Sequence, residues 1–198
     1  IILDEDEDAL ERTERRLSAQ GNRAHLVQAN FRELSDVLAR EKIDAADAIL
    51  FDLGVSTEEL LQSGRGFSFN SPTGADEPLL MSFAKYGREG KPTAREVVNR
   101  WSEENLAAII AGFGEERNAK RIARAIAEAR AKAPIETSKQ LAEIVAGAVA
   151  RRGRVHPATK TFQAIRMAVN EELPALEEGL RAALASLAGT ATKIGWDL

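Results

Sequence analysis

Apolar and polar positions in the first 54 residues follow a strand–helix–strand rhythm. Residues 1–3 and 24–27 are short apolar runs that predict strands, and the spacing from about Asp8 to Ser18 predicts a helix between them. A second helix is expected to begin close to Asn30. Residues 48–53, Ala-Ile-Leu-Phe-Asp-Leu, predict a third strand, buried and parallel to the others. This alternation is typical of a doubly wound α/β sheet.

The rest of the chain loses this rhythm. Residues 63–93 are rich in Gly, Ser and Pro and predict a long loop, and beyond it the periodicity is helical only. Thr137 and Gln140 form a capping-box pattern at the start of one of these helices. Apolar residues recur every three or four positions over 159–187, which predicts a last helix that Pro174 should kink or divide.

Composition excludes several classes of site. The 198 residues include no cysteine, which excludes a disulfide scaffold, a thiolate zinc site and a cysteine nucleophile. His25 and His156 are the only histidines, so we expect no metal site. No run approaches the roughly 18 consecutive apolar residues of a membrane span.

The net charge of −4 is unevenly distributed. Acidic residues predominate up to Glu59, beginning with the cluster at residues 4–8, and basic residues predominate from Arg117 to Arg166. This asymmetry indicates two roles, one of them contact with an anionic polymer. The alternative is that these charges form solvated helix faces.

Carboxylates follow two of the predicted strands. Asp4 could accept hydrogen bonds from the two hydroxyls of a ribose, and Asp52 could orient an amine-bearing ligand, because ligands of such folds bind beyond the carboxyl ends of the strands. Each could instead be an acid that only ends a strand or begins a helix. The loop Gly64–Phe69 (GRGFSF) suits stacking on a base or holding a phosphate, or is an ordinary turn.

A basic stripe is predicted on one helix. At 100° per residue, Arg117, Lys120, Arg121 and Arg124 share a face, and the opposite face is apolar. The apolar residues are Ala119, Ile122, Ala123 and Ile126. The stripe could bind phosphates or could only solubilise the helix.

Four strings carry a resemblance to a known family. They are Ile49–Ser56 (ILFDLGVS), Gly64–Phe69, Gly114–Ile126 (GEERNAKRIARAI) and His156–Leu173 (HPATKTFQAIRMAVNEEL). In order and spacing they resemble the ribosomal RNA small subunit methyltransferase H family, over about residues 1–188. The resemblance implies a cytoplasmic enzyme that uses S-adenosylmethionine (SAM) to methylate N4 of a cytidine in 16S rRNA of the small ribosomal subunit.

The resemblance also implies a fold and a division of the chain. The fold class is α/β: a Rossmann-like SAM-dependent methyltransferase sheet, incomplete here, with an inserted all-helical domain. The implied domains are a partial methyltransferase domain over 1–75, the helical insertion over 76–157, and a return to the methyltransferase domain over 158–198.

Site residues follow by the same resemblance. The expected SAM contacts are Asp4, Phe31, Asp52 and Glu59, the last standing where many members have glutamine. The expected RNA contacts combine the basic stripe with basic residues of two matching strings. They are Arg65, Arg117, Lys120, Arg121, Arg124, Lys160 and Arg166. No catalytic residue is assigned.

Two departures from the family pattern shape the expected activity. The family's glycine-rich loop would precede Ile1, and Gly189–Leu198 does not match its C-terminal strand. We therefore expect this chain by itself to bind SAM weakly and to be inactive. The alternative function is a non-catalytic RNA-binding fragment. A nicotinamide-dependent enzyme is a third reading, which the lack of G-x-G-x-x-G disfavours.

Overall fold

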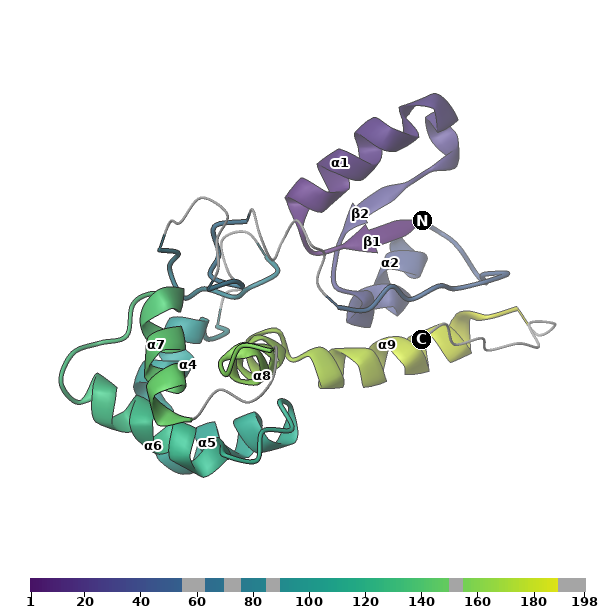
Figure 1. The fold of residues 1–198 in the computed structure, drawn as a ribbon. Helices are drawn as coiled ribbons and strands as arrows, with labels where there is room; N and C mark the ends of the chain where they lie inside the picture. Colours follow the sequence, from purple (N-terminus) through teal and green to yellow (C-terminus); the bar gives the residue numbers. More distant parts are fainter. Residues whose placement is uncertain (55–62, 70–75, 85–89, 150–154, 189–198) are drawn as a thin grey trace. The chain divides into compact units, whose positions relative to one another are not determined.

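The structure is a computed structural model that describes residues 1–54, 63–69, 76–84, 90–149 and 155–188 (Figure 1). Its internal contacts divide the chain into two compact units. Unit 1 combines Ile1–Gly54 with Glu172–Leu198, and unit 2 is Val55–Glu171. The loop Gly64–Phe69 and the first part of the last helical segment therefore belong to unit 2, whereas the implied domains place them with the methyltransferase domain.

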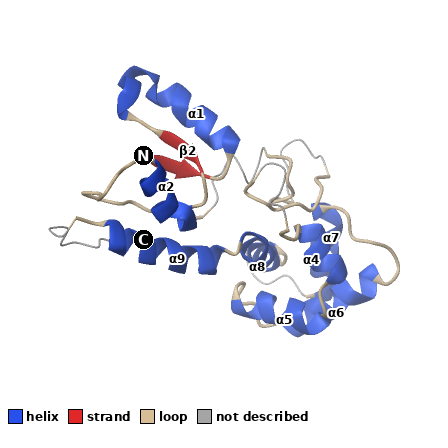
Figure 2. Cartoon of the chain, turned by 180° about the vertical axis from the view of Figure 1, so that it is seen from behind, coloured by secondary structure: helices blue, strands red, loops and turns tan. Residues whose placement is uncertain are grey.

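Unit 1 is built on two short parallel strands, as the sequence predicts. Strand β1 (Ile2–Asp4) pairs with β2 (Leu26–Gln28), and Asp4 lies opposite Gln28 in the register. Between them the chain forms helix α1 (Glu7–Leu17) and the 3-10 turn η1 (Ser18–Arg23). Figure 2 shows the strand pair in red, with α1 over one of its faces.

Helix α1 confirms the predicted first helix. The Asp6 side chain caps it by accepting a hydrogen bond from the Asp8 backbone N–H, at 3.3 Å. Its first turn is acidic and its last turn basic, as the helix dipole favours. None of its residues is fully buried, so α1 covers the strand pair with half-buried side chains only.

The other face of unit 1 is covered by later segments. After β2 the chain forms the 3-10 turn η2 (Phe31–Glu33) and helix α2 (Leu34–Arg40), and helix α9 (Glu172–Ser186) packs against both (Figures 1 and 2). Leu34, Leu38 and Ala183 are the buried centre of this contact. The prediction of a helix close to Asn30 is confirmed.

The predicted third strand at residues 48–53 is wrong. Among the described residues this segment has no strand to pair with, and Leu50 is 93% exposed. Only Ile49 and Phe51 turn inward, against the Leu34–Leu38–Ala183 cluster. A parallel strand forms only where a neighbour completes its hydrogen bonds, so an apolar run by itself does not specify one.

Unit 2 is helical wherever the described residues have regular structure. Helices α5 (Glu103–Gly112) and α6 (Ala119–Arg130) pack on each other, and α7 (Ser138–Ala148) packs on α6. Helices α4 (Ala94–Arg100) and α8 (Thr159–Asn170) complete a core in which Leu106, Ile122 and Ile165 are fully buried. The predicted helical character beyond residue 93 is confirmed.

The last helical pattern is divided, as Pro174 predicts, but the break precedes the proline. Helix α8 ends at Asn170, Glu171 adopts a left-handed conformation with φ of 50°, and α9 begins at Glu172. A proline ring clashes with the carbonyl four residues earlier, here that of Asn170. Pro174 is therefore accommodated in the first turn of α9, where backbone N–H groups have no intrahelical hydrogen bond to make and the missing N–H of proline costs nothing.

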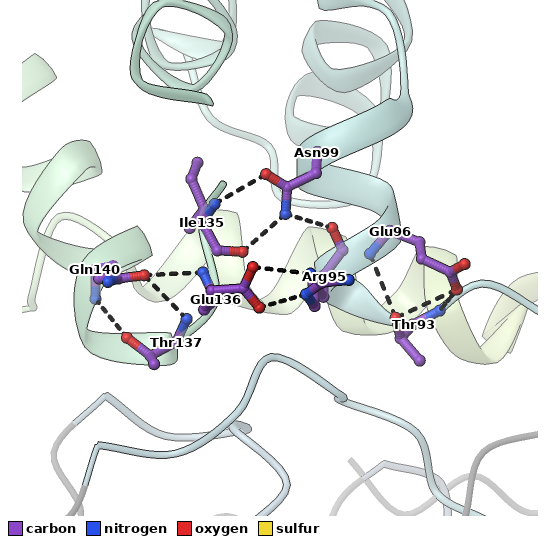
Figure 3. A network of polar contacts seen from close by, with 8 residues as sticks. All are labelled: Thr93, Arg95, Glu96, Asn99, Ile135, Glu136, Thr137 and Gln140. Carbon is purple, nitrogen blue, oxygen red and sulfur yellow. Dashed lines mark hydrogen bonds and ion pairs between the residues drawn. The ribbon is translucent and has the colours of Figure 1, made fainter. Parts of the chain in front are cut away.

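Helices α4 and α7 each begin with a capping box, and an ion pair and two hydrogen bonds connect the start of α4 to the segment before α7 (Figure 3). Thr93 and Glu96 cap α4, and Thr137 and Gln140 cap α7, the box that the sequence predicts. Arg95 forms a two-pronged ion pair with Glu136. Asn99 exchanges two hydrogen bonds with the backbone of Ile135, at 2.7 and 2.9 Å. These bonds help to fix the 135–137 segment, which also forms a β-bridge between Thr137 and Pro78.

Within the part of the chain that the structure describes, no helix combines the length and hydropathy needed to cross a membrane.

Candidate functional site

The candidate cofactor site lies in unit 1, at the carboxyl ends of β1 and β2. Because the strands are parallel and in register, Asp4 and Gln28 end them side by side. The loops that follow, residues 4–6 and 29–31, therefore leave the sheet at the same edge. This is the edge at which open α/β sheets bind their ligands.

Asp4 projects from the first of these loops. Its Oδ1 accepts a 2.9 Å hydrogen bond from the Asp6 backbone N–H. Burial of part of the side chain raises the pKa of Asp4, although the residue remains open to solvent. The charges of Asp6 and Glu5 also raise this pKa, and hydrogen bonds from the backbone of Asp6 and Glu5 lower it. A carboxylate with spare acceptor capacity at a strand end can receive a ligand hydroxyl.

Asn30 ties the second loop to the first. Its side-chain amide donates a 2.7 Å hydrogen bond to Oε2 of Glu5, and its Oδ1 accepts one of 2.9 Å from the Arg32 backbone N–H, which caps η2. Gln28 adds a 3.3 Å hydrogen bond to the Glu5 carbonyl. Asn30 is buried, so its own bonds are partly shielded from water, whereas the Gln28 bond is exposed; together they hold the two loops at a fixed separation.

Phe31 lies at the start of η2, directly after this anchor. Its ring meets that of Phe51 edge to face, with centroids 5.7 Å apart. Gly179 of α9 lies against both rings, and a Cβ there would be 2.7 Å from Phe31 Cδ2. Asp52 follows Phe51 and is exposed. The structure thus brings Phe31 and the Asp52 segment together and links Phe31 to the Asp4 loop through Asn30, whereas Glu59 lies outside the described residues.

Sequence reasoning missed two residues that build this site. The capping box at η2 is visible as Asn30 followed by Glu33, and a glycine inside an apolar helical pattern marks Gly179 as a point of close approach. The bond from Asn30 to Glu5 has no sequence signal, because it depends on the register of the strands.

In unit 2, two of the strings that carry the family resemblance meet. The ring of Phe69, in the Gly64–Phe69 loop, contacts the ring of His156 at a centroid distance of 4.4 Å and that of Phe162 at 4.8 Å. The Gly66 backbone N–H donates a 2.9 Å hydrogen bond to Glu77 Oε2, and a Cβ at Gly66 would lie 2.2 Å from the Pro78 carbonyl oxygen. The loop is therefore held tightly in place at these described residues.

The structure does not fit Arg65 as an RNA contact. Arg65 is 5% exposed, and its Nη1 donates hydrogen bonds to the carbonyl oxygens of Ser82 and Phe83. Its guanidinium also lies 5.4 Å from the centre of the Phe67 ring. A buried guanidinium that already serves two carbonyls holds the loop together, and it is not presented to a phosphate.

The basic stripe of α6 has the predicted orientation. Arg117, Lys120, Arg121 and Arg124 are all exposed, and the apolar residues of the opposite face are buried. Arg124 forms an ion pair of 2.9 Å with Glu128. Lys160, at the start of α8, is exposed and donates a 3.0 Å hydrogen bond to the Glu115 carbonyl, whereas Arg166 is half-buried.

Comparison with known proteins decides the family. The model of the MraW methylase family matches residues 1–193. The chain belongs to the MraW methylase family. This family of methyltransferases implies a Rossmann-like fold, of which unit 1 shows two parallel strands and their helices.

Curated relatives support the same family. A protein of Symbiobacterium thermophilum named ribosomal RNA small subunit methyltransferase H is 47% identical over 187 residues, which are 93% of this chain and 57% of the relative. Proteins of the same name from Persephonella marina and Rhodopseudomonas palustris are each 46% identical, over 91% and 92% of this chain and 60% and 53% of their own lengths. This MraW-family chain thus spans little more than half the length of the curated relatives it matches, and the resemblance seen in its sequence is confirmed.

Proposed function

We propose that this chain is part of a cytoplasmic SAM-dependent methyltransferase that methylates N4 of a cytidine in 16S rRNA of the small ribosomal subunit. The observation that carries the proposal is the carboxyl edge of unit 1, where Asp4 and Phe31 stand on loops tied by the bond from Asn30 to Glu5. Family membership over residues 1–193 gives this edge its chemistry. Unit 2 is then the helical insertion of the methyltransferase.

The residues at this edge suit the adenosine part of SAM. Asp4 has acceptor capacity for ribose hydroxyls, the Phe31 ring offers an apolar surface to the adenine, and the exposed Asp52 carboxylate can accept a hydrogen bond from an amino group. The bound cofactor supplies a methyl group activated by its sulfonium. Asp4, Phe31 and Asp52 therefore bind and orient in this proposal, and none of them takes part in the transfer.

The chemistry of the acceptor explains what else the enzyme needs. The N4 amine of cytosine is a weak nucleophile, because its lone pair is delocalised into the ring. It must be held in line with the methyl group, and it must lose a proton. The base must also leave its stack to enter a pocket, which requires contacts to the RNA on either side.

A chimera tests the proposal. Segments of the Symbiobacterium thermophilum relative that lie outside the matched 187 residues are joined to both ends of this chain. We expect the chimera to bind SAM by calorimetry and to transfer a tritiated methyl group to 16S rRNA, and Asp4→Ala to weaken SAM binding roughly tenfold or more. If Asp4→Ala leaves the SAM affinity of the chimera unchanged, the ribose contact is refuted. If the chimera methylates no RNA, the proposed function is refuted.

The second candidate function is a non-catalytic RNA-binding module. It is favoured by exposed arginine and lysine side chains at the start of α6 that have no partner within the described chain. The chimera decides between the two, because a non-catalytic module binds RNA but neither binds SAM nor transfers a methyl group.

A further inference from the structure

Three cations at the start of α6 have no partner within the described part of the chain. Arg117, Lys120 and Arg121 are exposed, and none of their side chains makes a hydrogen bond or ion pair there. The other exposed arginines of unit 2 among the described residues are paired. They are Arg95 with Glu136, Arg100 with Glu96, and Arg124 with Glu128.

The placement of these cations opposes the stability of α6. Lys120 and Arg121 lie in its first turn, where the helix dipole disfavours positive charge, and that turn contains no acidic residue. The neighbouring α5 has the favourable arrangement, with Glu103 and Glu104 in its first turn. Cations that weaken their own helix and have no internal partner indicate an anionic partner outside the chain.

Lys160 extends this group from another helix. Gly114 approaches α8 so closely that a Cβ would lie 2.5 Å from the Lys160 carbonyl oxygen. The Lys160 ammonium in turn donates its 3.0 Å hydrogen bond to the carbonyl of Glu115, two residues before Arg117. Arg121, Lys120, Arg117 and Lys160 therefore form one continuous surface, which we name the cationic ridge.

Carboxylates lie beside the ridge. A groove of about 820 Å³ is lined by Arg117, Lys120 and Arg121 together with Glu103, Glu104 and Glu116. Glu103 also acts on Arg124, whose pKa is raised by its hydrogen bond to Glu128 first and by the charges of Glu128 and Glu103 next. The Glu103 and Glu104 carboxylates therefore repel a polyanion from the start of α5, whereas Lys160 adds attraction beside Glu115.

We propose that the cationic ridge binds the phosphate backbone of RNA, along a path from the first turn of α6 towards Lys160. The choice of RNA rests on the proposed function, and guanidinium groups suit phosphate because they offer paired donors. A membrane surface fits less well. The large apolar side chains of α6 are buried, and none of the exposed ones in the described residues lies on α5 or α6, so the ridge has nothing to insert into lipid.

The test compares two triple variants of the 198-residue chain that remove the same charge. The ridge variant is Arg117→Gln, Lys120→Gln and Arg121→Gln. The control is Lys91→Gln, Arg95→Gln and Arg100→Gln, three paired cations of unit 2 away from the ridge. Fluorescence anisotropy measures binding of a single-stranded 16S rRNA fragment over a series of KCl concentrations, and circular dichroism checks that each variant is folded. We expect the ridge variant to lose roughly tenfold in affinity and the salt slope to shrink by about 2, with little change in the control.

Three results would refute RNA binding by the cationic ridge. They are no RNA binding by the unchanged chain, an equal loss in both variants, and a ridge-dependent binding to phosphatidylglycerol vesicles with no effect on RNA. Glu103→Gln with Glu104→Gln tests the direction of the path, and should raise RNA affinity by about two- to threefold; a fall would refute the path.

The same variants keep this inference separate from the proposed function. In the chimera, the ridge variant should keep its SAM affinity while RNA affinity falls. If RNA affinity is unchanged but Asp4→Ala still weakens SAM binding, the ridge fails and the methyltransferase stands. If the ridge governs RNA binding but the chimera neither binds SAM nor methylates, the proposed function fails and the ridge stands.

Discussion

The buried amide of Asn30 donates a 2.7 Å hydrogen bond to the carboxylate of Glu5, and so joins the loops that follow β1 and β2. The same side chain caps η2 through its oxygen. One residue therefore sets the position of the turn that carries Phe31 and the separation of that turn from Asp4.

Asn30→Asp isolates the contribution of this bond. An aspartate keeps the oxygen that caps η2 but places a second carboxylate against Glu5, where neither can donate. We expect the free energy of unfolding to fall by about 1–3 kcal/mol at pH 7. The loss should be smaller in acid, because two neutral carboxyl groups do not repel each other. Urea unfolding at pH 7 and pH 4 measures both; an equal loss at the two values would contradict the explanation.

Asp4→Asn should stabilise the chain slightly at neutral pH. Since the pKa of Asp4 in the folded state is raised from its usual 3.8, folding becomes less favourable as the pH rises through the window above 3.8. Asparagine keeps the oxygen that accepts from the Asp6 N–H and removes the charge. Scanning fluorimetry should show a small rise in Tm at pH 7 that disappears at pH 3. A lower Tm at pH 7 would mean that the charge is stabilising.

Gly179→Ala and Gly147→Ala form a matched pair. Both glycines are in helices, but a Cβ at 179 would be 2.7 Å from Phe31 Cδ2, whereas one at 147 meets nothing within 4 Å. We expect Gly179→Ala to cost about 1–3 kcal/mol through overpacking, and Gly147→Ala to gain up to about 1 kcal/mol in helix propensity. Amide hydrogen exchange measures the two effects separately: protection of α9 should fall in Gly179→Ala, and protection of α7 should rise in Gly147→Ala. Equal protection in both variants would show that Phe31 yields easily.

Asn170 should be among the least replaceable polar residues of unit 2. It is 3% exposed, accepts a 2.9 Å hydrogen bond from the Phe83 N–H and donates one of 2.7 Å to the carbonyl of Met81. Met81 has a φ of 52°, which side-chain-bearing residues rarely adopt, so these bonds also hold a strained turn. Asn170→Ala should cost about 2–4 kcal/mol in chemical unfolding, because it leaves a buried donor and acceptor unpaired. A cost below about 1 kcal/mol would show that the turn relaxes.

Figure 3 shows two contacts that we expect to contribute unequally to the free energy of unfolding. Asn99 is bonded in both directions to the backbone of the buried Ile135, whereas Arg95 and Glu136 pair on the exposed surface. Asn99→Ala should destabilise unit 2 by about 1–3 kcal/mol, and Arg95→Gln by much less. The Arg95 hydrogen bond lowers the pKa of Glu136, so the small contribution of the pair is lost as the pH falls through that lowered pKa. Thermal unfolding of both variants at pH 7 and pH 3 checks the order.

Local patterns predicted the elements that local physics determines. Strand β1, helix α1 and strand β2 follow from apolar runs separated by a well-capped amphipathic helix. The break at Asn170 was predicted only approximately, because the constraint of Pro174 acts on a carbonyl four residues upstream. The strand at 48–53 could not be judged from its own residues, since strand formation depends on a neighbour.

In the candidate sites, too, features set by local spacing could be predicted from the sequence, and features set by contacts between distant residues could not. The exposed face of α6 follows from helical spacing, and burial of the opposite face confirms it. Sequence could not distinguish Arg65 or Arg124 from the other cations, because the Ser82 carbonyl and the Glu128 carboxylate that engage them are visible only in space. The roles of Asp4, Phe31 and Asp52 stay predictions, to which the structure adds the anchor at Asn30.

The contribution of α9 to unit 1 has a consequence for synthesis on the ribosome. Phe31 and Phe51 pack on Gly179, which is translated about 130 residues after Phe51. At roughly 5–20 residues per second, these rings lack their packing partner for some 6 to 25 seconds. During that time unit 2, an uninterrupted segment, is completed. The residues of unit 1 that precede unit 2 in the chain thus reach their final packing after unit 2 has been made.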